Sequence, residues 1–123
     1  MLFSFAKQSK KTPDKGRYEI IRGIRTPYTD YPVTFITRNN KVVCVYNPKR
    51  KTFSRIGYYG NSLGYFDKGN FSYKDSIGRL TPESAIYYMY NPPKNRRLGF
   101  GSPILKDELT HFLPKSVIEA IKN

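Results

Sequence analysis

The chain has few of the residues that form covalent or metal cross-links, and this scarcity excludes several kinds of protein. Among its 123 residues there are one cysteine, Cys44, one histidine, His111, and no tryptophan. A single cysteine forms no intrachain disulfide, and no Cys/His cluster has the spacing of a zinc site. We therefore expect neither a metal nor a cofactor, and the cysteine content favours the reducing cytoplasm.

Long apolar runs are also missing. The apolar stretch at 1–5 precedes Lys7, Lys10 and Lys11, which reverses the order of a signal peptide. It is also far shorter than the roughly 20 residues that a membrane-spanning helix needs. The sequence thus predicts neither secretion nor membrane insertion.

Acidic residues are scarce relative to basic ones. Lys and Arg total 22 against 9 for Asp and Glu, a net charge of +13. Such a charge opposes compaction and is typical of proteins with a polyanionic partner. A protein whose dispersed cations contact phosphates along a nucleic-acid backbone gains affinity through counterion release, so DNA or RNA is the first partner that we expect. An anionic membrane surface, or a basic surface that serves only solubility, are the alternatives.

The remaining composition predicts a folded chain of one domain. Hydrophobic residues make up 38% and aromatic residues 15%, in a length that closes one core. Residues 6–16 contain Pro, Gly and four lysines without periodicity. We predict a flexible basic arm over 1–16 and a single globular domain over 17–123.

The clearest local pattern is a β-hairpin. Two β-branched runs at 33–38 and 41–46 flank Asn39 and Asn40, which tolerate positive φ. A two-residue turn pairs Arg38 with Lys41 on one side of the hairpin. The same register predicts one apolar face, buried against a helix beginning near Thr81. That face consists of Val33, Phe35, Val42, Cys44 and Tyr46.

Further patterns predict an α+β fold with strands first and helices last. Thr81-Pro82-Glu83 has the composition of a helix start, and Ser102-Pro103 repeats it after a basic loop, KNRRLGFG. The segment 60–79 is either a short hairpin or a long ordered loop. The expected antiparallel meander has strands at about 17–24, 33–38, 41–46 and 53–59, and the helices lie at about 82–90, 103–112 and 115–122.

The side of the sheet occupied by Arg55 stays open. Pairing Tyr46 with Phe53 places Arg55 on the core face opposite Cys44, unless a bulge or a one-residue slip intervenes.

Two clusters combine cations with features that suit nucleic acid. Phosphates attract cations, and unstacked bases stack on aromatic rings. In the second cluster, Gly99 and Gly101 allow a backbone to approach a ligand closely. Either cluster is also compatible with a loop that is simply solvated. The first cluster is Lys49, Arg50, Lys51 and Arg55 with Tyr58 and Tyr59, the second is Lys94, Arg96 and Arg97, and Arg38 with Lys41 adds a cationic pair.

Signals of catalysis are weak. His111 is the one side chain whose ordinary pKa lies near neutrality, but a histidine beside Phe112 on a terminal helix is commonly structural. Paired carboxylates, a phosphate loop and a nucleophile motif are absent from the sequence. The leading hypothesis is a nonenzymatic nucleic-acid-binding protein. The alternatives are a viral or plasmid-type effector that inhibits an acidic host protein, and a metal-independent, toxin-like ribonuclease using His111.

Overall fold

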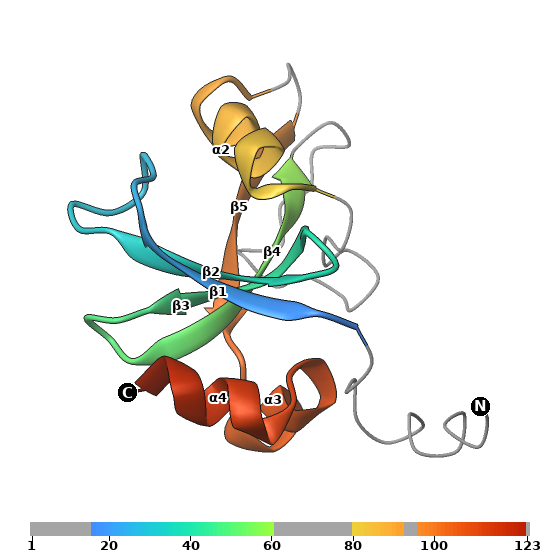
Figure 1. Cartoon of the computed structure of the whole chain (residues 1–123). Helices are drawn as coiled ribbons and strands as arrows, with labels where there is room; N and C mark the ends of the chain where they lie inside the picture. The colour runs from blue at the N-terminus through green and yellow to red at the C-terminus, as the bar shows by residue number, and fades with distance from the viewer. Residues whose placement is uncertain (1–15, 61–79, 93–95, 123) are drawn as a thin grey trace.

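The computed structural model describes residues 16–60, 80–92 and 96–122, which form one five-stranded antiparallel sheet and three helices (Figure 1). Residues 1–15 of the predicted arm over 1–16, residues 61–79 of the segment 60–79, and Lys94 lie outside the described residues. The strands follow one another in the sheet in chain order. Their bounds are β1 Tyr18–Ile24, β2 Val33–Arg38, β3 Lys41–Asn47, β4 Thr52–Gly60 and β5 Arg96–Pro103, and the helices are α2 Pro82–Tyr90, α3 Lys106–Phe112 and α4 Lys115–Lys122.

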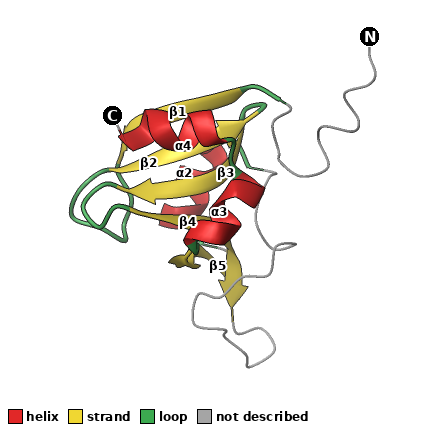
Figure 2. Ribbon diagram, turned by 90° about the horizontal axis from the view of Figure 1, so that it is seen from below, coloured by secondary structure: helices red, strands yellow, loops and turns green. Residues whose placement is uncertain are grey.

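Helices cover both faces of the sheet. Helix α2 packs on one face, whereas α3 and α4 lie together on the other (Figures 1 and 2). Two buried clusters result, one for each face. The α2 side buries Val33, Phe35, Val42, Val45, Ile56, Ala85, Met89 and Leu98. The α3/α4 side buries Ile36, Cys44, Tyr46, Phe53, Leu109, Leu113, Ile118 and Ile121.

The α+β class and most predicted elements are confirmed. Asn39 and Asn40 form the hairpin turn with φ angles of 51° and 71°, and Arg38 pairs with Lys41. Helix α2 begins as predicted, because the Thr81 hydroxyl accepts a hydrogen bond from the backbone N–H of Ser84 at 3.2 Å. Helix α4 also has the predicted bounds.

The predicted register of the hairpin is wrong. Ile36 pairs with Cys44 and Phe35 with Val45, because the register shifts between Ile36 and Thr37. An extra residue on β3 reverses the alternation of faces that follows it. Cys44 and Tyr46 therefore face α3 and α4, while Val33, Phe35 and Val42 face α2 as predicted.

The bulge lies where the chain before α2 meets the sheet. The backbone N–H of Val42 donates to the carbonyl of Leu80 at 2.7 Å. The ladder between β3 and β4 covers only the pairs from Val45–Ser54 to Asn47–Thr52, so β4 has left β3 at this level. The carbonyl of Leu80 thus accepts a hydrogen bond from a β3 backbone N–H that β4 does not reach.

A second correction concerns the basic segment after α2. The expected loop around Arg96 and Arg97 is strand β5, paired with β4 from Gly60–Arg96 to Ser54–Pro103. Pro103 ends this strand instead of starting a helix, and α3 begins only at Lys106. Proline is tolerated here because β5 is at the end of the described strand order, where one side of the strand needs no ladder partner.

Candidate nucleic-acid interface

The topology divides the predicted cations between two ends of the sheet. In an antiparallel meander, β2 and β4 end where β3 and β5 begin. Arg38 and Lys41 therefore lie at one end, which we call the 39–40 end; Arg96 and Arg97 begin β5 on the same topological side, but beyond the point at which β4 has left β3. Lys49, Arg50 and Lys51 lie at the other, the 48–51 end. Seven residues of β3 separate the ends by roughly 20 Å.

Hydrogen bonds to Asn47 fix the backbone of the turn at the 48–51 end. The side-chain carbonyl of Asn47 accepts hydrogen bonds from the backbone N–H groups of Lys49 and Arg50, both at 3.0 Å. The backbone N–H of Lys51 donates to the carbonyl of Asn47 at 2.7 Å. Lys51 has a φ of 60°, in the left-handed region that side chains other than Gly and Asn seldom adopt. These bonds fix three exposed cations next to one another.

Within the described part of the chain, Lys49, Arg50 and Lys51 make no ion pair. Like charges at successive positions repel, and an approaching anion would relieve this repulsion. The turn therefore offers phosphate an exposed and preformed cationic surface.

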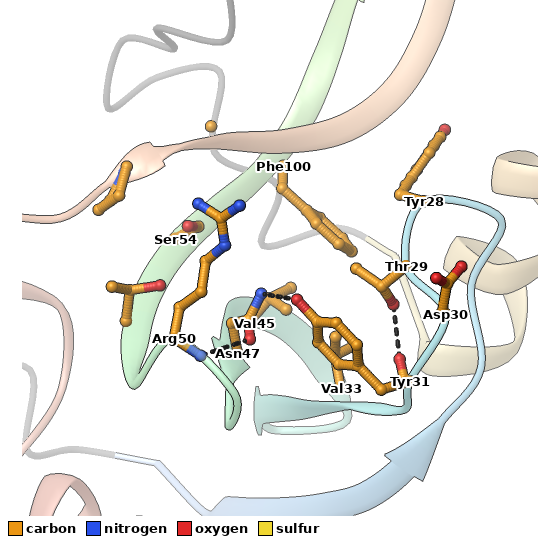
Figure 3. Close-up of a pocket in the computed structure, with 13 residues that line it drawn as sticks. Tyr28, Thr29, Asp30, Tyr31, Val33, Val45, Asn47, Arg50, Ser54 and Phe100 are labelled. Carbon is orange, nitrogen blue, oxygen red and sulfur yellow. Dashed lines mark hydrogen bonds between the residues drawn. The ribbon is translucent and has the colours of Figure 1, made fainter.

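A hollow of about 370 Å³ adjoins this turn on the α2 side of the sheet (Figure 3). Its walls come from three places in the chain: the β1–β2 connection, the 48–51 turn with its flanking strand ends, and the end of β5. Figure 3 shows the Arg50 side chain reaching along one wall, with Tyr31 and Phe100 opposite and Asp30 beyond them. The hollow thus combines aromatic rings, a guanidinium and one carboxylate.

The Tyr31 ring is held in place on this wall. Its hydroxyl accepts a hydrogen bond from the side-chain amide of Asn47 at 3.0 Å, and the Lys49 ammonium lies 5.0 Å from its ring centroid. The hydroxyl of Thr29 donates to the Tyr31 carbonyl at 2.6 Å. Asn47 therefore orients both the cationic turn and this ring.

Two further aromatic rings line the hollow. The rings of Tyr28 and Phe100 meet edge to face, with centroids 5.5 Å apart. The Tyr28 hydroxyl donates to the backbone carbonyl of Leu98 and so fastens the β1–β2 connection to β5. The sequence predicted the cations here but not Tyr28, Tyr31 and Phe100. The available signal was the two tyrosines of the TPYTDYP segment, which are brought to the turn only by the sheet order.

Elsewhere on the sheet, fewer of the predicted side chains are described. Arg38 and Lys41 lie half-buried across the hairpin, and Arg97 is exposed on β5. Tyr58 and Tyr59 stand opposite Leu98 and Arg97 in the β4–β5 ladder, and the structure describes only their backbone, as it does for Arg96. Their contribution to stacking or phosphate contact stays a prediction.

Arg55 lies away from both ends. The Tyr46–Phe53 pair is present, and Arg55 faces α3 on the same side as Cys44. Its guanidinium forms an ion pair with Glu108 at 3.5 Å and lies 4.7 Å from the Phe112 ring centroid. The register of the β4–β5 ladder shifts between Ser54 and Ile56, but Arg55 stays on this face, where these two contacts accommodate its charge. Its predicted contact with phosphate stays a prediction.

The other ionisable groups offer little for catalysis. Burial raises the pKa of the Cys44 thiol from 9.0 to about 12, so it is not a thiolate nucleophile near neutral pH. His111 is exposed in the last turn of α3. Residues 16–60, 80–92 and 96–122 contain no group of three or more His, Cys, Asp or Glu that could hold a metal, and none of their helices is long and apolar enough to cross a membrane.

Comparisons with protein-family models, with curated proteins and with solved structures give no significant match.

Proposed function

We propose that this protein binds nucleic acid without catalysis, in the cytoplasm, using its cations on phosphate and its tyrosines for stacking. The observation that carries the proposal is the 48–51 turn, in which Asn47 holds three adjacent, exposed cations beside an aromatic hollow. Phosphate contacts provide affinity through counterion release, and rings provide stacking surfaces for bases.

The two cationic ends suit an extended polyanion better than a small anion. They are separated by about 20 Å, the length of β3, which corresponds to about six base pairs of duplex at 3.4 Å each. The net charge of +13 adds long-range attraction to any such partner. The proposal therefore includes all the predicted cations: Arg38 and Lys41 at the 39–40 end, Lys49, Arg50 and Lys51 at the 48–51 end, and Lys94, Arg96 and Arg97 before and at the start of β5.

A filter-binding titration against labelled DNA and RNA, single-stranded and duplex, tests the proposal. We expect binding at low salt that weakens steeply as salt is added. No measurable binding to any of these in low salt would contradict the proposal and favour an acidic protein partner. Degradation of RNA that persists with chelator and is lost in His111→Ala would instead favour the ribonuclease alternative.

A further inference from the structure

The size and lining of the hollow beside the turn indicate what kind of nucleic-acid ligand the protein binds, an inference that rests on the proposed function. A volume of about 370 Å³ lies at the lower end of the range for pockets that hold small molecules. Val33 and Val45 form part of its floor, so an occupant would cover the edge of the α2-side core. The hollow therefore matches a ligand of about the size of one nucleotide.

The chemistry of the walls narrows the class of ligand. Arg50 favours a phosphate, the rings of Tyr31 and Phe100 favour a flat aromatic group, and Asp30 accepts hydrogen bonds from N–H donors. A bare phosphate would use Arg50 and be repelled by Asp30. An apolar ligand would make no polar contact with Arg50 or Asp30. A nucleotide uses all three features, because it joins a phosphate to a ring with N–H donors on its edge.

The hollow is also assembled before any ligand arrives. Tyr31 is fixed by Asn47, Lys49 and Thr29, and the Tyr28 hydroxyl ties the opposite wall to β5. Side chains that are already ordered lose little conformational entropy when they bind. A ring held in this way is suited to receive a base.

We infer that this hollow binds one unpaired nucleotide of a single-stranded nucleic acid, with its base against Tyr31 and Phe100 and its phosphate on Arg50. The bases of a duplex are stacked within the helix, and extruding one costs a few kcal/mol. The protein therefore binds single strands more tightly than duplexes of the same length, although the duplex carries twice as many phosphates.

By fluorescence anisotropy at low and at raised salt, and with a free mononucleotide as an unlabelled competitor, the test compares three labelled ligands of equal length. They are a single-stranded oligodeoxynucleotide, a fully abasic strand and a duplex. Tyr31→Leu removes the ring, and Tyr87→Leu is the matched control, since Tyr87 is exposed on α2 and does not line the hollow. Circular dichroism confirms that each variant is folded, and Phe100→Leu replaces Tyr31→Leu if the latter is unfolded.

We expect Tyr31→Leu to weaken binding of the base-containing single strand by about 5- to 100-fold, the range for loss of one stacked base. Binding of the abasic strand and the duplex should be unchanged, and Tyr87→Leu should bind like the wild type. Salt-dependent binding with equal affinity for all three ligands, unaffected by Tyr31→Leu, would overturn the inference and leave the proposed function standing. Equal affinity for the strand and for a free mononucleotide would overturn the assignment to a strand. Binding of none of the ligands would contradict the proposed function itself.

Discussion

Arg55 on β4 and Glu108 on α3 form an ion pair at 3.5 Å across the interface between the sheet and its helical layer. The side chain of Arg55 is 19% exposed and that of Glu108 52% exposed. The Arg55 guanidinium also lies against the Phe112 ring, which belongs to the same helix. These contacts explain how a cation is accommodated on a face whose buried residues are mostly apolar, and they attach α3 to β4.

Replacing Arg55 by Gln should therefore reduce stability. Loss of a partly exposed ion pair and of a cation–ring contact predicts a fall of about 1–2 kcal/mol in the free energy of unfolding, measured by urea denaturation. Glu108→Gln is the matched variant and should cost less, because the contact with Phe112 remains. An unchanged stability in Arg55→Gln would contradict this role. A fall of about one unit in the salt slope of binding would add the phosphate contact that the sequence predicted.

Phe35 should be a major source of stability. Its side chain is fully buried in the α2-side cluster with Ala85 and Met89. Phe35→Ala should lower the free energy of unfolding by about 3–5 kcal/mol, because it leaves a cavity between β2 and α2. Tyr90→Ala, at an exposed position of α2, should stay within about 0.5 kcal/mol of the wild type. Similar losses in the two variants would contradict the packing described above.

Cys44 should make stability depend on alkaline pH. Its thiol pKa is about 12 in the folded protein and 9.0 without burial, so above pH 9 the unfolded chain binds fewer protons than the folded one. Stability is therefore retained below pH 9 and falls by up to about 1.4 kcal/mol per pH unit between 9 and 12. Because lysines and tyrosines titrate in the same range, the measurement is the difference between the wild type and Cys44→Ala in urea denaturation at several pH values. A constant difference across this range would contradict the burial of the thiol.

His111 should be dispensable for binding. It is exposed in the last turn of α3 and belongs to neither end of the sheet. His111→Ala should bind DNA and RNA with an affinity within about twofold of the wild type, and we expect both proteins to leave RNA intact. A hydrolytic activity that disappears in this variant would contradict the nonenzymatic account.

Local sequence patterns predicted the elements whose structure depends on neighbouring residues. Asn39 and Asn40 adopt the positive φ angles that their composition favours, and Thr81 caps α2 through its own hydroxyl. The bulge in β3 was not predictable in this way. It lies next to Leu80, nearly forty residues further along the chain, and it moved Cys44 and Tyr46 to the other face.

Strand β5 was missed because its sequence weakens the strand signal. Gly99, Gly101 and Pro103 are residues that favour turns, and their pairing with β4 depends on a partner outside the segment. The candidate site, too, was only partly predictable from local sequence patterns. The cations of the 48–51 turn were evident from the sequence, whereas the hollow depends on Tyr31 and Phe100, which only the tertiary structure brings to that turn.

The salt dependence of nucleic-acid binding tests the central claim most directly. Lys49, Arg50 and Lys51 are replaced together by Gln, and the matched control replaces Lys106, Lys115 and Lys122, which are exposed on the α3/α4 layer and carry the same total charge. If the turn contacts phosphates, the slope of log K against log salt should flatten by about two to three units in the turn variant and by less than one in the control, with both folds intact. An unchanged slope in the turn variant, or equal flattening in both, would contradict a phosphate-binding site at the 48–51 turn.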